Sequence, residues 1–209
     1  MKFITFEGCD FSGKSTQIKL LKQYFEINKK KVFLTREPGG TKFAEKVRSL
    51  LLSDKEILDP IIEYLLLSAA RRDHVNHLIK KKMGQGCYVL SDRFYDSSLC
   101  YQGCYKNLDN AVLEVIRYIT IDIFQPDLTF LIDISENEIL KRASKKREGG
   151  NFYDIKSQKF YRIIRQGYLA IANNNPKRVV IIDGNQNILN VARQINKVIN
   201  RKVFYSSNE

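Results

Sequence analysis

The sequence predicts an α/β protein of three layers, in which a five-stranded parallel sheet is covered by helices on both faces. Two observations support this prediction. Five short apolar segments alternate along the chain with segments of helical periodicity, and such alternation is typical of parallel sheets. In addition, no internal repeat and no linker-like segment interrupts the 209 residues. We therefore expect a single domain over residues 1–209.

The first half of the chain holds three expected helices. Residues 14–27 and 41–52 repeat apolar side chains at a helical spacing. Asp59 and Pro60 mark the start of the third helix, because Asp caps a helix well and Pro suits the first helical position. That helix can continue to about Met83, where a glycine follows. The apolar strands expected around these helices are residues 2–6, 32–35 and 87–90.

The second half continues the alternation. A helix is expected over residues 108–124 and a strand over 128–134, and Ser135 with Glu138 forms a capping box that opens the next helix. The stretch "REGGNFYD" is rich in glycine and polar residues, and we expect a mobile lid at about residues 143–154. The remaining expected elements are a helix to about residue 172, a strand at 178–182 and a last helix from about 187.

Composition narrows the class of protein. The formal net charge is +12, but the lysines are dispersed along the chain, so we expect a solvated basic surface and no nucleic-acid partner. No apolar run approaches the length of a membrane span, and no secretory signal is evident. We therefore expect a cytoplasmic protein with no membrane partner. The cysteines lack the spacing of a zinc site or a disulfide scaffold, and we expect reduced thiols at Cys9, Cys87, Cys100 and Cys104.

A phosphate-binding motif directly follows the first expected strand. Residues 8–15, "GCDFSGKS", match G-x-x-x-x-G-K-[ST] in full, with a strand before and a helix after. The two glycines let backbone N–H groups wrap around phosphates, and the helix N-terminus adds partial positive charge. Lys14 can reach the β and γ phosphates, and the Ser15 hydroxyl can bind Mg²⁺. The fold is therefore expected to be of the P-loop NTPase type.

The rest of the sequence indicates which P-loop class this is. It contains neither the DxxG nor the NKxD motif of GTPases. Polar segments instead follow the second and third expected strands, "TREPGGT" at residues 35–41 and "SDRFYDSSLCYQG" at 91–103, with Arg48 and Arg71 on the helices between them. Ligands of parallel sheets bind beyond the carboxyl ends of the strands. Two phosphate sites in one small domain indicate phosphoryl transfer between nucleotides.

These blocks resemble the thymidylate kinase family over nearly the whole chain. "FEGCDFSGKST", "TREPGGT", "AEKVRSLLL", "SAARRDHV", "SDRFYDSSLCYQG" and "PDLTFLIDI" fall in the family's order and spacing. The resemblance implies transfer of the γ-phosphoryl of ATP to thymidine monophosphate (dTMP), giving dTDP for dTTP biosynthesis. It also implies Mg²⁺ and a homodimer. The apolar stretch "IIEYLLLSAA" of the long helix after Pro60 is the expected dimer surface.

The resemblance also assigns site residues. It implies catalytic roles for Lys14, Arg93 and Asp10. The donor ATP is expected at Gly8, Cys9, Asp10, Phe11, Ser12, Gly13, Lys14, Ser15, Thr16 and Arg142. The acceptor dTMP is expected at Asp10, Arg36, Glu37, Pro38, Gly39, Arg48, Leu67, Arg71, Arg93, Ser97, Ser98, Tyr101 and Gln102. The metal is expected at Ser15 and Asp92, whose position at the end of the third strand suits a carboxylate that orients Mg²⁺.

Two departures from the family pattern concern the acceptor base and the lid. Leu67 stands where many members carry a Phe that stacks on thymine. The family's catalytic arginine comes either from the P-loop, where this chain has Phe11, or from the lid, where alignment gives Asn151-Phe152. We expect Arg147, at the start of the lid, to replace it. His74 and His77 are expected to pack or face solvent, because phosphoryl transfer needs no histidine base.

Two other functions remain open on the sequence alone. Another nucleoside or nucleotide kinase would share the same P-loop core and differ only in the shape of its acceptor pocket. A basic P-loop protein that binds nucleic acid without turnover would instead need Lys and Arg gathered on one face with aromatic residues between them. The dispersed charge favours a kinase.

Overall fold

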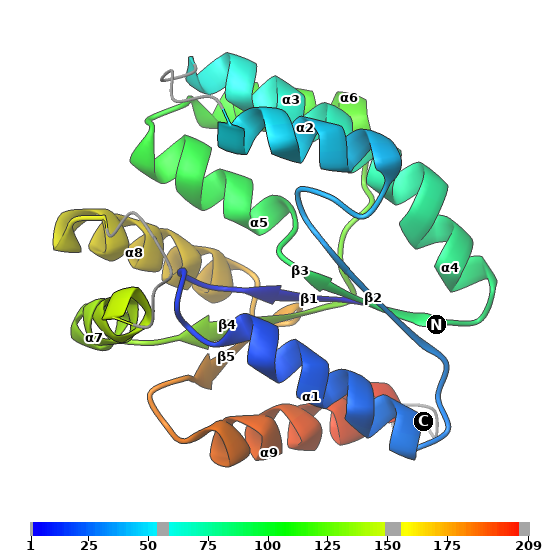
Figure 1. The fold of residues 1–209 in the computed structure, drawn as a ribbon. Helices are drawn as coiled ribbons and strands as arrows, with labels where there is room; N and C mark the ends of the chain where they lie inside the picture. Colours follow the sequence, from blue (N-terminus) through cyan, green and yellow to red (C-terminus); the bar gives the residue numbers. More distant parts are fainter. Residues whose placement is uncertain (1, 54–58, 149–155, 205–209) are drawn as a thin grey trace.

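A computed structural model describes residues 2–53, 59–148 and 156–204 of the chain. Its centre is a parallel sheet with the strand order β2-β3-β1-β4-β5. Each strand is followed by a helix before the next strand begins, which confirms the predicted α/β class (Figure 1). The strands are β1 (Phe3–Glu7), β2 (Val32–Arg36), β3 (Tyr88–Asp92), β4 (Leu128–Asp133) and β5 (Val179–Asp183).

Two helices cover one face of the sheet. These are α1 (Lys14–Ile27) and α9 (Ile188–Ile199), which ends in a π-helical turn, η3 (Asn200–Phe204) (Figure 1). Apolar side chains from both helices and from β1, β3, β4 and β5 form one core, which includes Phe6, Phe25 and Phe130. Because β1 is buried along its whole length, the loop that follows it starts from a fixed position at the centre of the sheet.

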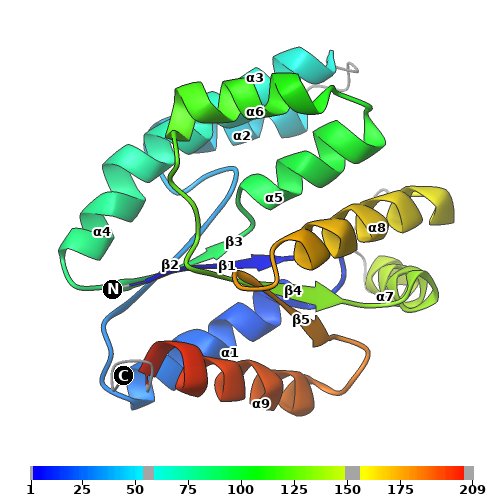
Figure 2. The same ribbon diagram turned by 180° about the vertical axis from the view of Figure 1, so that it is seen from behind.

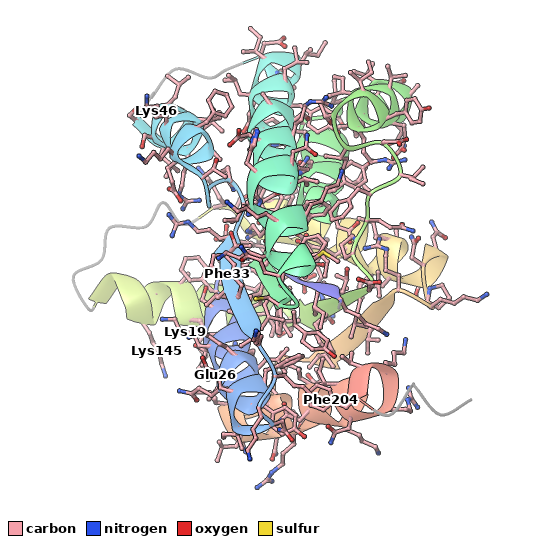
Figure 3. All side chains as sticks on the ribbon, turned by 90° about the vertical axis from the view of Figure 1, so that its right-hand side faces the viewer. Lys19, Glu26, Phe33, Lys46, Lys145 and Phe204 are labelled. Atoms are coloured by element: carbon pink, nitrogen blue, oxygen red, sulfur yellow. The ribbon has the colours of Figure 1, made fainter. Side chains whose placement is uncertain are left out.

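Most of the remaining helices lie on the opposite face, which is best seen from behind, while α7 (Glu136–Glu148) lies beyond the carboxyl ends of β4 and β5 (Figure 2). Next to the sheet lie α8 (Gln158–Asn174) and a continuous helical segment made of α5 (Tyr95–Ser98) and η2 (Leu99–Tyr105). Farther from the sheet, α3 (Pro60–His74) packs between α2 (Lys42–Ser53) and α6 (Asn110–Ile121). Figure 3 looks onto the amino ends of the strands, with Phe33 labelled on the edge strand β2.

The long helix predicted after Pro60 is present, with an irregularity in its middle. It consists of α3, a π-helical turn η1 (Val75–Ile79) and α4 (Lys80–Gly84). It begins at Asp59, whose carboxylate accepts hydrogen bonds from the backbone N–H groups of Ile61 (2.8 Å) and Ile62 (3.3 Å). Its end at Gly84 agrees with the predicted end near Met83.

The structure refines three of the segments discussed above. The strand predicted at 87–90 is β3, which runs to Asp92 because its last residues pair with β2 and β1. Residues 95–105 form a helix, on which Ser97 and Tyr101 lie four residues apart. Residues 143–148, with which the predicted lid begins, belong to α7. The rest of the predicted lid, residues 149–154, lies outside the described residues.

Among the helices of the described segments, none is both long and apolar enough to cross a membrane.

The cap at Asp59 gives a test of how α3 is held. Asp59→Ala removes the acceptor for two backbone N–H groups and should lower the free energy of unfolding by about 1 kcal/mol. Asp59→Asn keeps a capping oxygen and should remain within about 0.5 kcal/mol of the parent. Urea denaturation followed by far-ultraviolet circular dichroism measures both. Equal losses in the two variants would show that the cap does not hold this helix.

Candidate active site

A cavity of about 1680 Å³ lies at the carboxyl ends of the strands. Residues that follow β1, β3 and β5 line it, and the arrowheads of Figure 1 mark these ends. Parallel sheets commonly bind ligands at this edge. The cavity therefore lies where the sequence predicted both phosphate sites.

The loop after β1 has the backbone of a phosphate cradle. Gly8 and Gly13 have φ values of +136° and +96°, which favour glycine. A Cβ on Gly8 would lie 2.5 Å from the carbonyl oxygen of Ile132, so the loop can approach β4 only without a side chain there. The Lys14 Nζ donates to the carbonyl oxygens of Gly8 (2.9 Å) and Cys9 (2.7 Å).

Lys14 is a buried cation in this cradle. Burial, with a smaller contribution from the nearby positive charge of Arg93, lowers the pKa of Lys14 to about 8. A bound phosphate would supply the opposite charge that favours the protonated amine. The cradle therefore suits an anion, and it favours the negatively charged phosphates that the motif predicts.

Ser15 and Asp92 meet at the mouth of the cradle. The Ser15 hydroxyl donates to the Asp92 Oδ2 at 2.9 Å, which joins the start of α1 to the end of β3. A hydroxyl and one carboxylate are hard oxygen ligands, and Mg²⁺ commonly keeps several waters and takes only one or two protein carboxylates beside substrate phosphates. Among the described residues, no group of three or more His, Cys, Asp or Glu side chains could hold a metal. The pair thus fits Mg²⁺ bound together with a nucleotide.

Arg93 donates hydrogen bonds to four side chains from three segments of the chain. Its Nη2 donates to Asp10 Oδ1 (2.6 Å) and Tyr101 OH (3.1 Å). Its Nη1 donates to Ser97 Oγ (3.0 Å) and Tyr168 OH (2.9 Å). These contacts join the P-loop, the helix after β3 and α8 at one guanidinium group.

The positive charge of Arg93 lowers the pKa of the neighbouring Asp10 carboxyl. Burial alone would raise the pKa of Asp10, but the positive charges of Arg93 and Lys14 more than offset it, so that the pKa lies below its usual value. Asp10 is therefore ionised at neutral pH. Its carboxylate lines the cavity beside two cations and remains half-exposed.

The buried side chain of Glu37 holds the turn after β2 in place. Its carboxylate accepts from Arg71 Nε (2.7 Å) and lies 2.9 Å from His74 Nδ1. Arg71 also donates to Ser98 Oγ at 2.9 Å and is 4 % exposed. His74 is fully buried and reaches Thr35 through its other ring nitrogen (2.7 Å). His74 thus packs and supports the turn, in agreement with the expectation.

Two further arginines near this turn, Arg36 and Arg48, differ in where they point. Arg36 pairs with Glu45 (2.9 Å) on the exposed surface. Arg48 donates to the carbonyl oxygen of Pro38 (3.1 Å) and lines the cavity. The exposed His77 pairs with Asp73 at 2.7 Å. Of these side chains, only Arg48 is available to an anion in the cavity.

Arg142 lies on the donor side of the cavity. Its guanidinium bonds Glu138 (2.8 Å) and the carbonyl oxygen of Gly184 (2.9 Å), and it approaches the carbonyl oxygen of Ser12 at 3.3 Å. It therefore joins α7 to the P-loop and to the loop after β5. The backbone of Arg147 belongs to the last turn of α7 rather than to a loop, and its side chain lies outside the part of the chain that the structure describes.

The structure brings most of the predicted residues together. The cavity lining includes Asp10, Phe11, Ser12, Gly13, Lys14, Ser15, Thr16, Arg48, Asp92, Arg93, Tyr101, Gln102 and Arg142. Other predicted residues are not part of the lining: Gly8, Cys9, Arg36, Glu37, Pro38, Gly39, Leu67, Arg71, Ser97 and Ser98. Four of these residues nevertheless bond directly to a residue that lines the cavity or to Arg71: Gly8, Glu37, Ser97 and Ser98.

Three groups of residues were missed. The loop after β5, with Gln186 and Asn187, lines the cavity, and its position after a strand was a usable signal. Glu7 is a carboxylate at the end of an otherwise uncharged buried strand, which also marks it in the sequence. Tyr168 lies in an amphipathic helix among other buried aromatic residues, so that no local pattern distinguishes it.

Comparisons with known proteins agree with this geometry. A family model described as thymidylate kinase matches residues 6–195. A thymidylate kinase from Sulfurihydrogenibium sp. is 40% identical over 198 residues and covers 94% of each chain. One from Mycoplasma capricolum is 39% identical over 203 residues, 96% of this chain and 95% of that protein.

A solved structure supports the same conclusion in three dimensions. The crystal structure of thymidylate kinase from Ehrlichia chaffeensis superimposes with a TM-score of 0.76 at 36% identity, over 95% of this chain and 98% of that one. The P-loop NTPase-type fold is thereby confirmed. With a matching family model, close relatives over the whole length and a phosphate cradle facing a second set of arginines, the chain belongs to the thymidylate kinase family of enzymes.

Proposed function

We propose that this chain transfers the γ-phosphoryl group of ATP to dTMP and so produces dTDP for dTTP biosynthesis. The observation that carries the proposal is the presence of two cationic sites on one cavity. Lys14 lies in the P-loop, and Arg48 and Arg93 lie across from it beside the turn after β2 and the end of β3. Two phosphate groups can therefore meet head to head between them.

In the proposed reaction, side chains of this protein place positive charge around the phosphates and do not transfer protons. ATP phosphates occupy the cradle of residues 8–16, where Lys14 stabilises negative charge on the transferred group. Arg48 and Arg93 hold the acceptor phosphate, since guanidinium groups bind phosphate oxygens in pairs. Asp10, half-exposed beside Arg93, accepts a hydrogen bond from the sugar of the acceptor. Such positioning supplies most of the catalysis in phosphoryl transfer.

Ser15 and Asp92 are the residues we assign to Mg²⁺. When bound, the ion would neutralise charge on the phosphate oxygens of ATP. Arg142 supports the cradle from the side of α7 through its contacts with Ser12 and Gly184. Arg147, five residues beyond Arg142 on the same helix, remains the residue that we propose in place of the family's catalytic arginine.

We further propose a homodimer formed through α3 and α6. These helices pack against each other, and Arg72 on α3 bonds the carbonyl oxygens of Ile119 and Thr120 on α6, each at 3.0 Å. Large apolar side chains remain exposed on both helices: Ile61, Ile62, Leu65, Val115, Tyr118 and Ile119. An apolar surface shared by two helices is typical of a protein interface.

The acceptor specificity is tested by measuring ADP release with each common nucleoside monophosphate. We expect dTMP to give the highest kcat/KM, because the blocks around Arg71 and Arg93 match those of the family. Leu67 can pack on a base without stacking, so binding should survive with weaker affinity. Faster turnover of guanosine or cytidine monophosphate would instead assign the chain to another nucleotide kinase activity. DNA binding without turnover would favour a nucleic-acid switch.

The phosphate cradle is tested by Lys14→Ala. Loss of one preorganised charge donor should lower kcat by at least about 10²–10³-fold. Because the Lys14 amine donates to two backbone oxygens of its own loop and to Ser12, the thermal transition of the variant should remain cooperative. Lys22→Ala serves as the control, because this half-buried lysine of the same helix pairs with Glu26 at 3.2 Å and does not line the cavity; the variant should keep kcat within about twofold. A Lys14 variant with near-parental kcat would contradict the assignment.

The dimer is tested by placing a charge on its proposed surface. Ile119→Asp puts a carboxylate on an apolar patch, at a position 67% exposed, and should convert the dimer to a monomer in analytical ultracentrifugation at micromolar concentration. Ile27→Asp, at a position 78% exposed on α1, is the matched control and should leave the sedimentation coefficient unchanged. A parent that sediments as a monomer would refute the proposal.

A further inference from the structure

Beneath Arg93 lies a buried polar group that does not reach the cavity. The Tyr168 hydroxyl lies 2.9 Å from Arg93 Nη1, 2.8 Å from Ser97 Oγ and 3.1 Å from Glu7 Oε2. Tyr168 is 2% exposed and Glu7 is 1% exposed, and neither lines the cavity. Their hydroxyl and carboxylate therefore lie behind the cavity, where Tyr168 contacts Arg93 directly and Glu7 contacts Tyr168 and Ser97.

Glu7 also holds the backbone that follows Arg93. Its Oε1 accepts the Phe94 N–H at 2.7 Å, and its Oε2 accepts the Ser97 hydroxyl at 2.6 Å. Burial and the nearby Asp96 raise the pKa of Glu7 to about 7. An ionisable group is costly to bury, and three donors offset that cost at Glu7: the Phe94 N–H and the hydroxyls of Ser97 and Tyr168.

The backbone at Arg93 needs such support. Its φ of +71° lies in the left-handed region, which costs a non-glycine residue about 1–3 kcal/mol. Three contacts hold it: Arg93 N–H to the Phe6 carbonyl oxygen (2.9 Å), the Ser91 hydroxyl to the Arg93 carbonyl oxygen (2.8 Å), and Phe94 N–H to Glu7. The conformation turns the side chain away from β3 and toward the cavity.

We propose that Glu7 and Tyr168 are positioning residues for Arg93. Glu7 acts through Ser97 and through the backbone that follows Arg93, and Tyr168 acts through one guanidinium nitrogen of Arg93. The inference rests on the proposed function, in which Arg93 holds the acceptor phosphate. With Nη1 bound to Tyr168 and Ser97, the guanidinium group keeps one orientation, and its Nη2 edge faces the cavity beside Asp10.

The packing of α8 explains how Tyr168 reaches this position. A Cβ on the preceding residue, Gly167, would lie 3.0 Å from Cys104 Sγ and 3.2 Å from Cys100 Sγ. The absence of a side chain there lets α8 approach η2 closely.

The central experiment removes only the hydroxyl, with Tyr168→Phe. We expect kcat/KM for dTMP to fall about tenfold, because one hydrogen bond to a charged group is lost, while KM for ATP stays within about twofold. The matched control is Tyr64→Phe, which deletes an equally buried hydroxyl that donates to the Leu113 carbonyl oxygen at 2.9 Å. It should lower stability without changing either kinetic constant beyond twofold.

A double-mutant cycle with Arg93→Lys identifies the route of the effect. Lys cannot hold the paired contacts of Arg. Once Arg93 is replaced, Tyr168→Phe should therefore lower kcat/KM for dTMP only slightly further. Losses that multiply in the double variant would overturn the proposal, as would a Tyr168→Phe enzyme within twofold of the parent. If Tyr168→Phe does not fold, Glu7→Gln takes its place in the cycle, because an amide nitrogen cannot accept from Ser97 and Tyr168.

A measurement without substrate separates this inference from the proposed function. In ¹⁵N NMR spectra of the parent, the guanidinium N–H signals of Arg93, assigned by their loss in Arg93→Lys, should exchange slowly with water. They should exchange fast in Tyr168→Phe and remain slow in Tyr64→Phe. If the parent phosphorylates no nucleoside monophosphate, the proposed function fails while this test still applies. Equal exchange in parent and Tyr168→Phe would refute the positioning role.

Discussion

The guanidinium group of Arg93 is the point on which the geometry of the cavity depends. It is bonded to the P-loop through Asp10, to the helix after β3 through Ser97 and Tyr101, and to α8 through Tyr168. These segments come from three distant parts of the chain, and the sheet alone fixes only the points where they begin. A planar group with donors in fixed directions sets their relative positions more strictly than a flexible ammonium group could.

Electrostatic repulsion is the other constraint on the cavity. Lys14, Arg48, Arg93 and Arg142 all line it, and the low pKa of Lys14 shows that burial and the neighbouring cation disfavour its charged form. Such a surface is most stable when anions separate the cations. Bound phosphates would favour the charged form of Lys14 and would so stabilise the folded protein. The net charge of the chain is in this sense compatible with small anionic ligands.

The sequence predicted the sheet, the P-loop and most of the cavity lining because these depend on local pattern. Buried strands are short apolar runs, and residues directly after them meet at one edge of a parallel sheet, so that Lys14, Asp92 and Arg93 could be placed together in advance. Ser, Tyr and Cys have weak helix propensity, so the helix at 95–105 depends on its packing against α8. Tyr168 could not be found from the sequence, because its role depends on contacts with Ser97 and Glu7, which lie 71 and 161 positions away along the chain.

The π-helical turn η2 places the last residues of its helix. The N–H of Lys106 bonds the carbonyl oxygen of Tyr101, five residues earlier, at 3.2 Å, and both residues line the cavity with Tyr105. A π-helical turn carries one residue more than a regular helix needs. A relative that lacked one residue here would keep its helix and its P-loop, but everything beyond the deletion would rotate by about 100°. Length variation at this point could therefore reshape the acceptor side of the cavity while the phosphate cradle stayed the same.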